Sequence, residues 1–203
     1  MANIALIGAS GNIGGRILAE ALTRGHTVTG IVRNPDRLSA QPRLKIASGD
    51  IANPAELARQ LTGADVVVAS VRWSDNASQL LEAVRLSGVG RLITVVGAGS
   101  LEDRPGVRVL DTADFPAAWR PGAEGAARAL DTLRAERNTD WVAVSPSFHI
   151  GPGERTGKFR VGGDQLLRDA AGESRISRED FAVAIVDEIE KPKHHRQRIT
   201  VGY

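Results

Sequence analysis

The sequence predicts an α/β fold of Rossmann type, a doubly wound parallel sheet with helices on both faces, built as a single domain over residues 1–203. Three observations predict it. Short apolar runs alternate with helix-like segments, a glycine-rich turn joins the first such pair, and a length of 203 residues suits one domain. A hydrophobic fraction of 42% and a charged fraction of 25% are typical of an ordinary packed core.

The first βαβ unit carries the glycine-rich turn. Residues 3–7 (NIALI) are the expected first strand, GASGNIG is the turn, apolar residues then recur at helical spacing up to Gly25, and residues 28–32 are the second strand. Such a turn lets the backbone approach a pyrophosphate at the N-terminus of a helix. A tight turn without a ligand is the alternative. We expect a dinucleotide to bind at Gly8, Ser10, Gly11, Asn12, Ile13 and Gly14.

The end of the second strand distinguishes the two nicotinamide cofactors. NAD sites usually place Asp or Glu there for the ribose hydroxyls, whereas NADP sites place Arg for the 2′-phosphate. The segment IVRNPDRL places Arg33 at this position, and no acidic residue occurs in residues 27–35. A guanidinium can bind a phosphate through two hydrogen bonds. We therefore expect NADP (NADPH) as cofactor, bound by Arg33 with help from Arg37.

The alternation continues to the end of the chain, as a parallel sheet with crossover helices requires. Further strands are expected at residues 44–47, 64–70, 91–96, 141–145 and 199–201. Further helices are expected from Asn53-Pro54 onward, over residues 75–87 and 122–138, and from Ser177 to Pro192. Ser177 and Asp180 are interpreted as cap residues of the last helix.

Ligands of such sheets bind beyond the carboxyl ends of the strands. We expect the adenine near Asp50 and Ile51 and the nicotinamide ribose near Ser70, Val71 and Arg72. The substrate is expected near Gly97 and Ser100. Trp73 could stack on a flat substrate or simply pack in the core. Two segments are expected as substrate-pocket loops, residues 97–121 with Phe115 and Trp119 as lining, and residues 147–164, of which the glycine-rich part could form a lid.

Composition excludes several kinds of chemistry. With no Cys there are no disulfides and no thiol nucleophile, and we expect no metal site. Lys and Arg number 26 against 24 Asp and Glu and are scattered, so no nucleic-acid partner is expected. No apolar run approaches the roughly 20 residues of a membrane span, so no membrane partner is expected. The start lacks the basic region of a signal peptide, and a cytoplasmic location is predicted.

The glycine-rich turn resembles that of short-chain dehydrogenases, but the acid that those enzymes usually carry is missing. Those enzymes and their epimerase relatives generally use a Tyr with a Lys four positions on, but the only Tyr of this chain is Tyr203. His149 follows the strand at residues 141–145, on the ligand side of the sheet. Its imidazole could act as an acid or as a hydrogen-bond donor to a carbonyl or flavin. A structural loop His is the alternative.

The glycine spacing GxxGxxG is typical of the extended and atypical branches of the short-chain dehydrogenase/reductase superfamily. Within it, the chain resembles the NAD(P)H-binding NADH-flavin reductase group and is similar to the biliverdin reductase B (flavin reductase) family. The resemblance rests on GASGNIGG, IVRNPDRL, SGDI, RLITVVGAGSL, DFPAAW, SPSFHIGPGERTGKFR, ISREDFAVAIVDEIEKP and RITVGY, which together span nearly the whole chain. It implies a catalytic role for His149. The family's active-site Ser falls near Gly97, where this sequence has no hydroxyl, and Ser100, three residues on, is a candidate substitute.

The function predicted from these observations is NADPH-dependent hydride transfer to a flavin (FMN or FAD) or a quinone-like flat acceptor. Such a reaction needs little acid catalysis, because the cofactor carries the hydride and the protein orients two flat rings. One alternative is a non-catalytic NADP-sensing regulator of the NmrA-like type, whose partner would be a protein. Another is an NAD(P)-dependent isomerase or epimerase, which the missing Tyr weakens. A monomer or a homodimer is expected.

Overall fold

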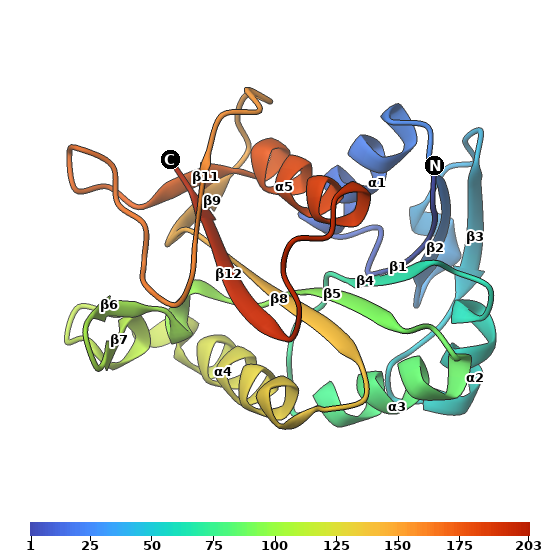
Figure 1. The fold of residues 1–203 in the computed structure, drawn as a ribbon, viewed down its shortest axis with the longest axis horizontal. Helices are drawn as coiled ribbons and strands as arrows, with labels where there is room; N and C mark the ends of the chain where they lie inside the picture. Colours follow the sequence, from blue (N-terminus) through green and yellow to red (C-terminus); the bar gives the residue numbers. More distant parts are fainter.

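An eight-stranded sheet forms the centre of the molecule, and the computed structural model describes residues 1–203 throughout (Figure 1). From edge to edge the strands are β10 (Arg160–Gly162), β12 (Gln197–Gly202), β8 (Asp140–Pro146), β5 (Arg91–Val95), β4 (Val66–Ala69), β1 (Asn3–Ile7), β2 (Thr27–Val32) and β3 (Leu44–Ser48). Every neighbouring pair is parallel except β10 and β12. The predicted Rossmann-type sheet is therefore confirmed, with one antiparallel strand added at its edge.

Helices cover both faces of the sheet, as Figure 1 shows. One face carries α1 (Gly14–Thr23) and α5 (Arg178–Glu190), and the other carries α2 (Pro54–Leu61), α3 (Ala77–Ser87) and α4 (Arg120–Ala135). Each face buries its own apolar cluster, built around Leu6, Ile17 and Phe181 on one side and around Leu80 and Leu130 on the other. The strands are apolar on both faces because both faces are buried.

Residues 97–121 hold more regular structure than their weak periodicity predicts. They contain the short strands β6 (Glu102–Arg104) and β7 (Val107–Arg108), and α4 begins at Arg120 rather than at residue 122. A small separate cluster of buried side chains supports this segment, made of Leu101, Val109, Leu110, Phe115 and Ala127. Such short elements are stabilised by contacts between residues distant in sequence, and the periodicity of the sequence does not reveal these contacts.

Residues 151–164, here called the strap, follow the short strand β9 (His149–Gly151), which pairs with β11 (Arg175–Ser177). Within the strap, Arg155 donates two hydrogen bonds of 2.7 Å to Glu20 on α1. Glu20 is buried and also pairs with Arg24 at 2.7 Å. The hydrogen bond from Arg155 holds the pKa of Glu20 below its usual value, with help from Arg24 and against the opposing effect of burial.

The strap is also attached to the first turn of α5. Ser177 caps this helix as predicted, since its hydroxyl accepts the N–H of Asp180 at 2.9 Å. The fully buried Asp180 carboxylate accepts hydrogen bonds from the Thr156 hydroxyl (2.6 Å), the Gly157 N–H (2.7 Å) and the Tyr203 hydroxyl (2.9 Å). The one Tyr of the chain therefore has a structural partner in a helix cap.

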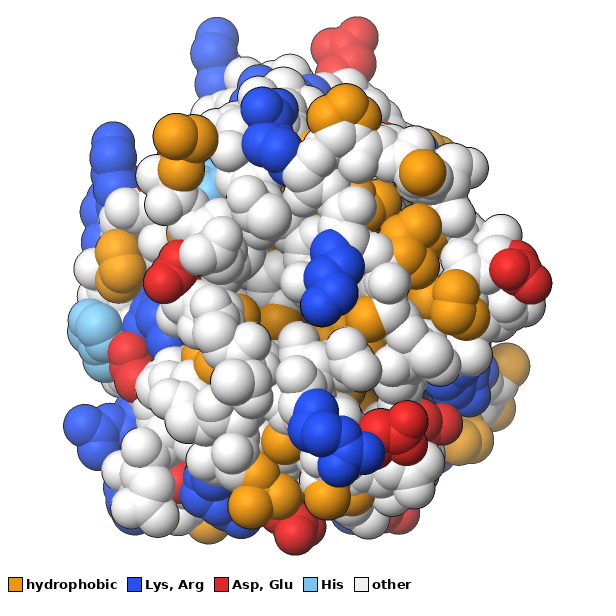
Figure 2. Space-filling model, turned by 90° about the vertical axis from the view of Figure 1, so that its right-hand side faces the viewer, with side chains coloured by type: hydrophobic (Ala, Val, Ile, Leu, Met, Phe, Trp, Pro, Cys, Tyr) orange, Lys and Arg blue, Asp and Glu red, His pale blue; other side chains and the backbone are white.

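The surface seen in Figure 2 carries basic and acidic side chains interspersed, with no single-sign stripe on that face. This agrees with the formal net charge of +2. None of the helices has the length and apolar character needed to cross a membrane. The cytoplasmic location stays a prediction.

Candidate functional site

The glycine-rich turn lies where the sheet changes its direction of winding, because β1 has β2 on one side and β4 on the other. Gly8 follows β1 with a φ of +83°, and a Cβ there would collide with the carbonyl oxygen of Ser70, just past β4. Gly14 begins α1, and a Cβ there would collide with the Gly8 carbonyl oxygen. Glycine at these two positions lets the strand ends and the helix N-terminus meet.

The entry into α1 leaves backbone donors without partners. No side chain caps this helix, and the N–H groups of Asn12 and Ile13 make no hydrogen bond within the protein. Unpaired N–H groups at the positive end of a helix suit the phosphates of a dinucleotide. The turn therefore fits a pyrophosphate both in backbone shape and in donors.

A cleft of about 560 Å³ runs from this turn along the carboxyl ends of β1, β2, β3 and β4. We call it the cofactor cleft. It is lined by Ile7, Gly8, Ser10, Gly11, Ile31, Val32, Arg33, Arg37, Gly49, Asp50, Ile51, Ser70, Val71, Arg72, Ser74 and Asn76. Nine of the predicted cofactor residues are among them, from four separate segments of the chain: Gly8, Ser10, Gly11, Arg33, Arg37, Asp50, Ile51, Ser70 and Val71.

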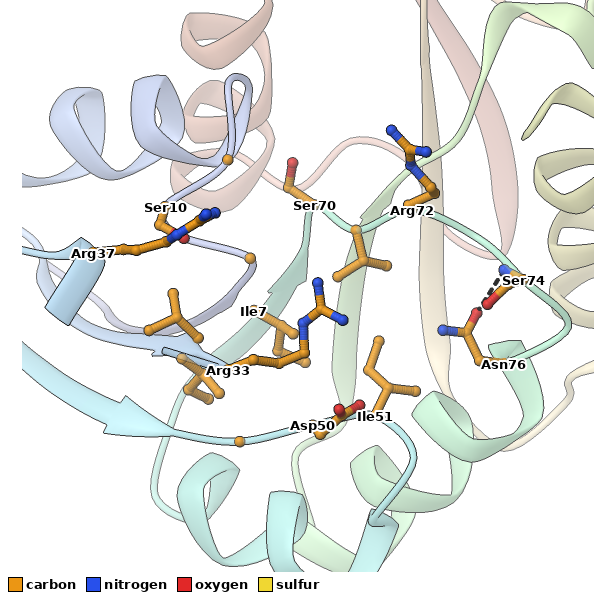
Figure 3. Close-up of a pocket in the computed structure, with 16 residues that line it drawn as sticks. Ile7, Ser10, Arg33, Arg37, Asp50, Ile51, Ser70, Arg72, Ser74 and Asn76 are labelled. Carbon is orange, nitrogen blue, oxygen red and sulfur yellow. Dashed lines mark hydrogen bonds between the residues drawn. The ribbon is translucent and has the colours of Figure 1, made fainter. Parts of the chain in front are cut away.

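The charges of the cofactor cleft are mostly positive. Figure 3 shows Arg33 reaching into the cleft, with Arg37 and Arg72 on opposite sides of it. The guanidinium groups of Arg33, Arg37 and Arg72 have no hydrogen bond or ion pair within the protein, and Asp50 is the single carboxylate of the lining. Unpaired guanidinium groups are suitable partners for phosphate oxygens.

A second, apolar hollow continues from the cofactor cleft, with which it shares Val71 and Arg72. We call it the inner hollow. It has a volume of about 290 Å³ and is lined by Ile13, Val71, Arg72, Trp73, Val95, Val96, Gly97, Ala98, Gly122, Ala126, Pro146, Ser147, Phe148 and Ile150. Arg72 is its only ionisable residue. The Ser147 hydroxyl is buried and donates to the Val201 carbonyl at 3.1 Å, so the inner hollow offers no side-chain acid.

A third hollow, of about 630 Å³, shares Phe148 with the inner hollow. We call it the outer hollow. Its lining consists of Asp103, Arg104, Val107, Val109, Asp111, Thr112, Ala113, Asp114, Phe115, Phe148, His149, Leu166, Arg168, Gly172, Glu173 and Ser174. His149 is exposed here, with its ring edge-on to Phe148 at 4.9 Å between centroids. It does not line the inner hollow.

Ser100 is separated from His149 and lines none of the three hollows. It is 8% exposed, and its hydroxyl accepts a hydrogen bond of 3.0 Å from the buried Arg198. Arg198 also pairs with Asp164, and burial lowers the pKa of this guanidinium against the effect of that carboxylate. Gly97, three residues earlier, lines the inner hollow.

The three aromatic residues expected near the substrate, Trp73, Phe115 and Trp119, lie in different surroundings. Trp73 packs in the core at 5% exposure, where its indole N–H donates to the Val95 carbonyl at 2.8 Å, and part of its side chain borders the inner hollow. Phe115 lines the outer hollow, with its ring edge-on to that of Phe148 at 6.2 Å between centroids. Trp119 is 52% exposed and lies against Phe148 at 5.8 Å.

Arg72, expected near the nicotinamide ribose because it follows a predicted strand, borders both the cofactor cleft and the inner hollow. Phe148 was missed from the sequence. It lines both the inner and the outer hollow, and nothing in the local pattern distinguishes it from a core aromatic residue.

Comparison with known proteins agrees with this geometry. Residues 8–192 match the model of a family described as NAD(P)H-binding. A solved structure from Burkholderia pseudomallei, provisionally named an exported protein, is 41% identical with a TM-score of 0.92, and covers 100% of both chains. One from Bacteroides thetaiotaomicron, provisionally named an epimerase, is 39% identical with a TM-score of 0.94, covering 99% of this chain and 96% of the other.

A third similar structure, from Streptococcus pneumoniae TIGR4, is provisionally named an NADH-flavin reductase. It is 34% identical with a TM-score of 0.84 and covers 100% of this chain and 99% of the other. The family match spans the glycine-rich turn and every strand and helix from α1 to α5. The chain is therefore a member of the NAD(P)H-binding family.

Proposed function

We propose that the protein is an NADPH-dependent oxidoreductase that delivers hydride to a flat acceptor of the flavin or quinone type. The observation that carries the proposal is the inner hollow. It adjoins the cofactor cleft, most of its lining is apolar, and it contains no Tyr, His, Lys or carboxylate. An acceptor that needs a positioned acid would find none there, whereas a flat ring needs only a surface to lie against.

The binding mode of the cofactor follows from the cleft. The pyrophosphate would lie against the glycine-rich turn, at the free N–H groups of Asn12 and Ile13. Arg33 and Arg37 would hold the 2′-phosphate, which supports NADPH over NADH. The nicotinamide would then extend past Val71 into the inner hollow.

The cofactor supplies the hydride, that is, two electrons and one hydrogen. The acceptor must also gain one proton to become fully reduced, and NADPH becomes NADP⁺. Since no acid lines the inner hollow, that proton would come from water. His149 faces the outer hollow, so its role would be a hydrogen bond to the acceptor rather than protonation over the nicotinamide. Ser100, bonded to Arg198, would not touch the acceptor.

The test is the oxidation of NADPH, followed by its absorbance, with riboflavin, FMN, FAD and quinones as acceptors, against a matched set of aldehydes and ketones. We expect turnover with at least one flat acceptor, well above the reaction without protein, and none with the carbonyl compounds. Tight NADPH binding without turnover of any acceptor would refute the proposal. That result would favour the NADP-sensing regulator, whose protein partner would then be sought.

A further inference from the structure

The outer hollow has a floor and a rim of different chemistry. Its floor is apolar and partly aromatic, formed by Val109, Phe115, Phe148 and Leu166. Its rim is ionisable, with four carboxylates and two arginines, a formal balance of −2: Asp103, Asp111, Asp114, Glu173, Arg104 and Arg168. An apolar floor with a few polar groups around it is typical of a small-molecule site.

Not all of these rim charges are free. Arg168 pairs with Asp103 at 2.5 Å, and Arg104 contacts the same carboxylate at 3.8 Å. Asp111 pairs with Arg108, which lies outside the lining, at 2.7 Å. The side chains of Asp114 and Glu173 are exposed and make no hydrogen bond or ion pair. These two carboxylates therefore remain available to a ligand as hydrogen-bond acceptors.

The outer hollow adjoins the site proposed for the acceptor ring, since Phe148 lines both hollows. Phe148 borders both the inner and the outer hollow, and Phe115 and Trp119 contact its ring at 6.2 Å and 5.8 Å between centroids. A ring held in the inner hollow could pass a substituent across Phe148 into the outer one. The substituent would then meet carboxylates, whereas the cofactor lies in a cleft with three unpaired arginines.

We propose that the outer hollow binds the substituent carried by the acceptor ring, and that it selects acceptors whose substituent is an uncharged polyol, as in riboflavin, over phosphorylated ones such as FMN. This inference rests on the proposed hydride transfer to a flat acceptor. Hydroxyl groups can donate to the free carboxylates of Asp114 and Glu173, while His149 supplies a further polar partner. A phosphate, with about −1.5 to −2 charges, would be repelled by the same carboxylates.

Riboflavin and FMN differ only in that phosphate, so they form a matched pair for the test. Each is titrated into the protein saturated with NADP⁺, and binding is followed by the change in flavin fluorescence. We expect riboflavin to bind about fivefold more tightly than FMN, which corresponds to about 1 kcal/mol. The difference should shrink in high salt, since about 1 M salt screens charges beyond roughly 3 Å.

The variant Asp114→Asn/Glu173→Gln tests the residues directly. Both side chains are exposed and unpaired, so the fold should persist, and the preference for riboflavin should fall to less than about twofold, mainly through tighter FMN binding. The matched control is Glu82→Gln on α3, an exposed and unpaired carboxylate that lines none of the three hollows and should leave the preference intact.

Equal or tighter binding of FMN, a preference that the double variant leaves unchanged, or no binding of riboflavin at all would each overturn the inference. The proposed function, hydride transfer to a flat acceptor, is refuted by a different result. It fails if NADPH is not oxidised with any flat acceptor, even where the protein binds riboflavin with the expected preference. Binding and turnover are therefore measured on the same preparations.

Discussion

Replacing Arg33 by Ala should change which nicotinamide cofactor the protein prefers. The Arg33 guanidinium is exposed, lies in the cofactor cleft and has no partner in the protein, so its removal breaks no internal contact. The loss is one charge-assisted hydrogen bond to the 2′-phosphate, about 1.5–3 kcal/mol. This predicts binding of NADPH weakened about ten- to a hundredfold. NADH has no phosphate there and should lose less than about twofold.

Arg37 lies in the same cleft and should retain part of the attraction. We therefore expect the single variant at the low end of the range and Arg33→Ala/Arg37→Ala at the high end. The assay is a titration of both cofactors by nicotinamide fluorescence, with the Michaelis constants measured beside it once an acceptor is known. Arg59→Ala is the control, because Arg59 on α2 is exposed, unpaired and outside the three hollows. A thermal melt checks that each variant is folded.

Two results would refute this reasoning. Equal losses for NADPH and NADH in the Arg33→Ala variant would mean that Arg33 contacts something common to both cofactors. Unchanged NADPH binding in the double variant would mean that the phosphate lies elsewhere in the cleft.

Gly8→Ala should weaken NADPH binding at least tenfold and lower the melting temperature, because a Cβ at φ +83° would collide with the Ser70 carbonyl; unchanged binding by titration would contradict this. Ser100→Ala should leave kcat with a flat acceptor within about threefold, since its hydroxyl bonds Arg198; a loss of a hundredfold or more, with the fold intact, would restore its catalytic role. Glu20→Gln should destabilise the protein at neutral pH. Its lowered pKa contributes stability that is present above about pH 4.5 and is lost on acidification, so the variant's unfolding free energy should fall less between neutral pH and about pH 3; parallel pH curves in urea titrations would exclude this.

The first βαβ unit could be predicted because its signals are local. Helical spacing after the turn, Gly25 at the helix end and Arg33 after the second strand each depend on a few neighbouring residues. Gly8 could be assigned to the turn for the same reason. The directions of the side chains at the substrate end of the sheet could not be predicted, because they depend on contacts with residues far away in the sequence.

The segment around His149 illustrates this limit. Its short strand pairs with residues 175–177, and that pairing sets the side of the chain on which each side chain lies. Counting along the sequence placed His149 past the end of a strand, which is correct, but could not assign it to the outer hollow. The contact of Ser100 with Arg198 spans 98 positions and leaves no local signal.

The attachment of the strap has a consequence for the time course of turnover. A glycine-rich flap held only at its ends would open on the nanosecond to microsecond scale. Here the Asp180 carboxylate holds Thr156 and Gly157, and Arg155 is bound to α1, so displacement of the strap means partial unfolding of the cap of α5. Such opening is a rare local unfolding event. Entry and exit of small molecules would therefore proceed past the exposed rim of the outer hollow rather than wait for the strap.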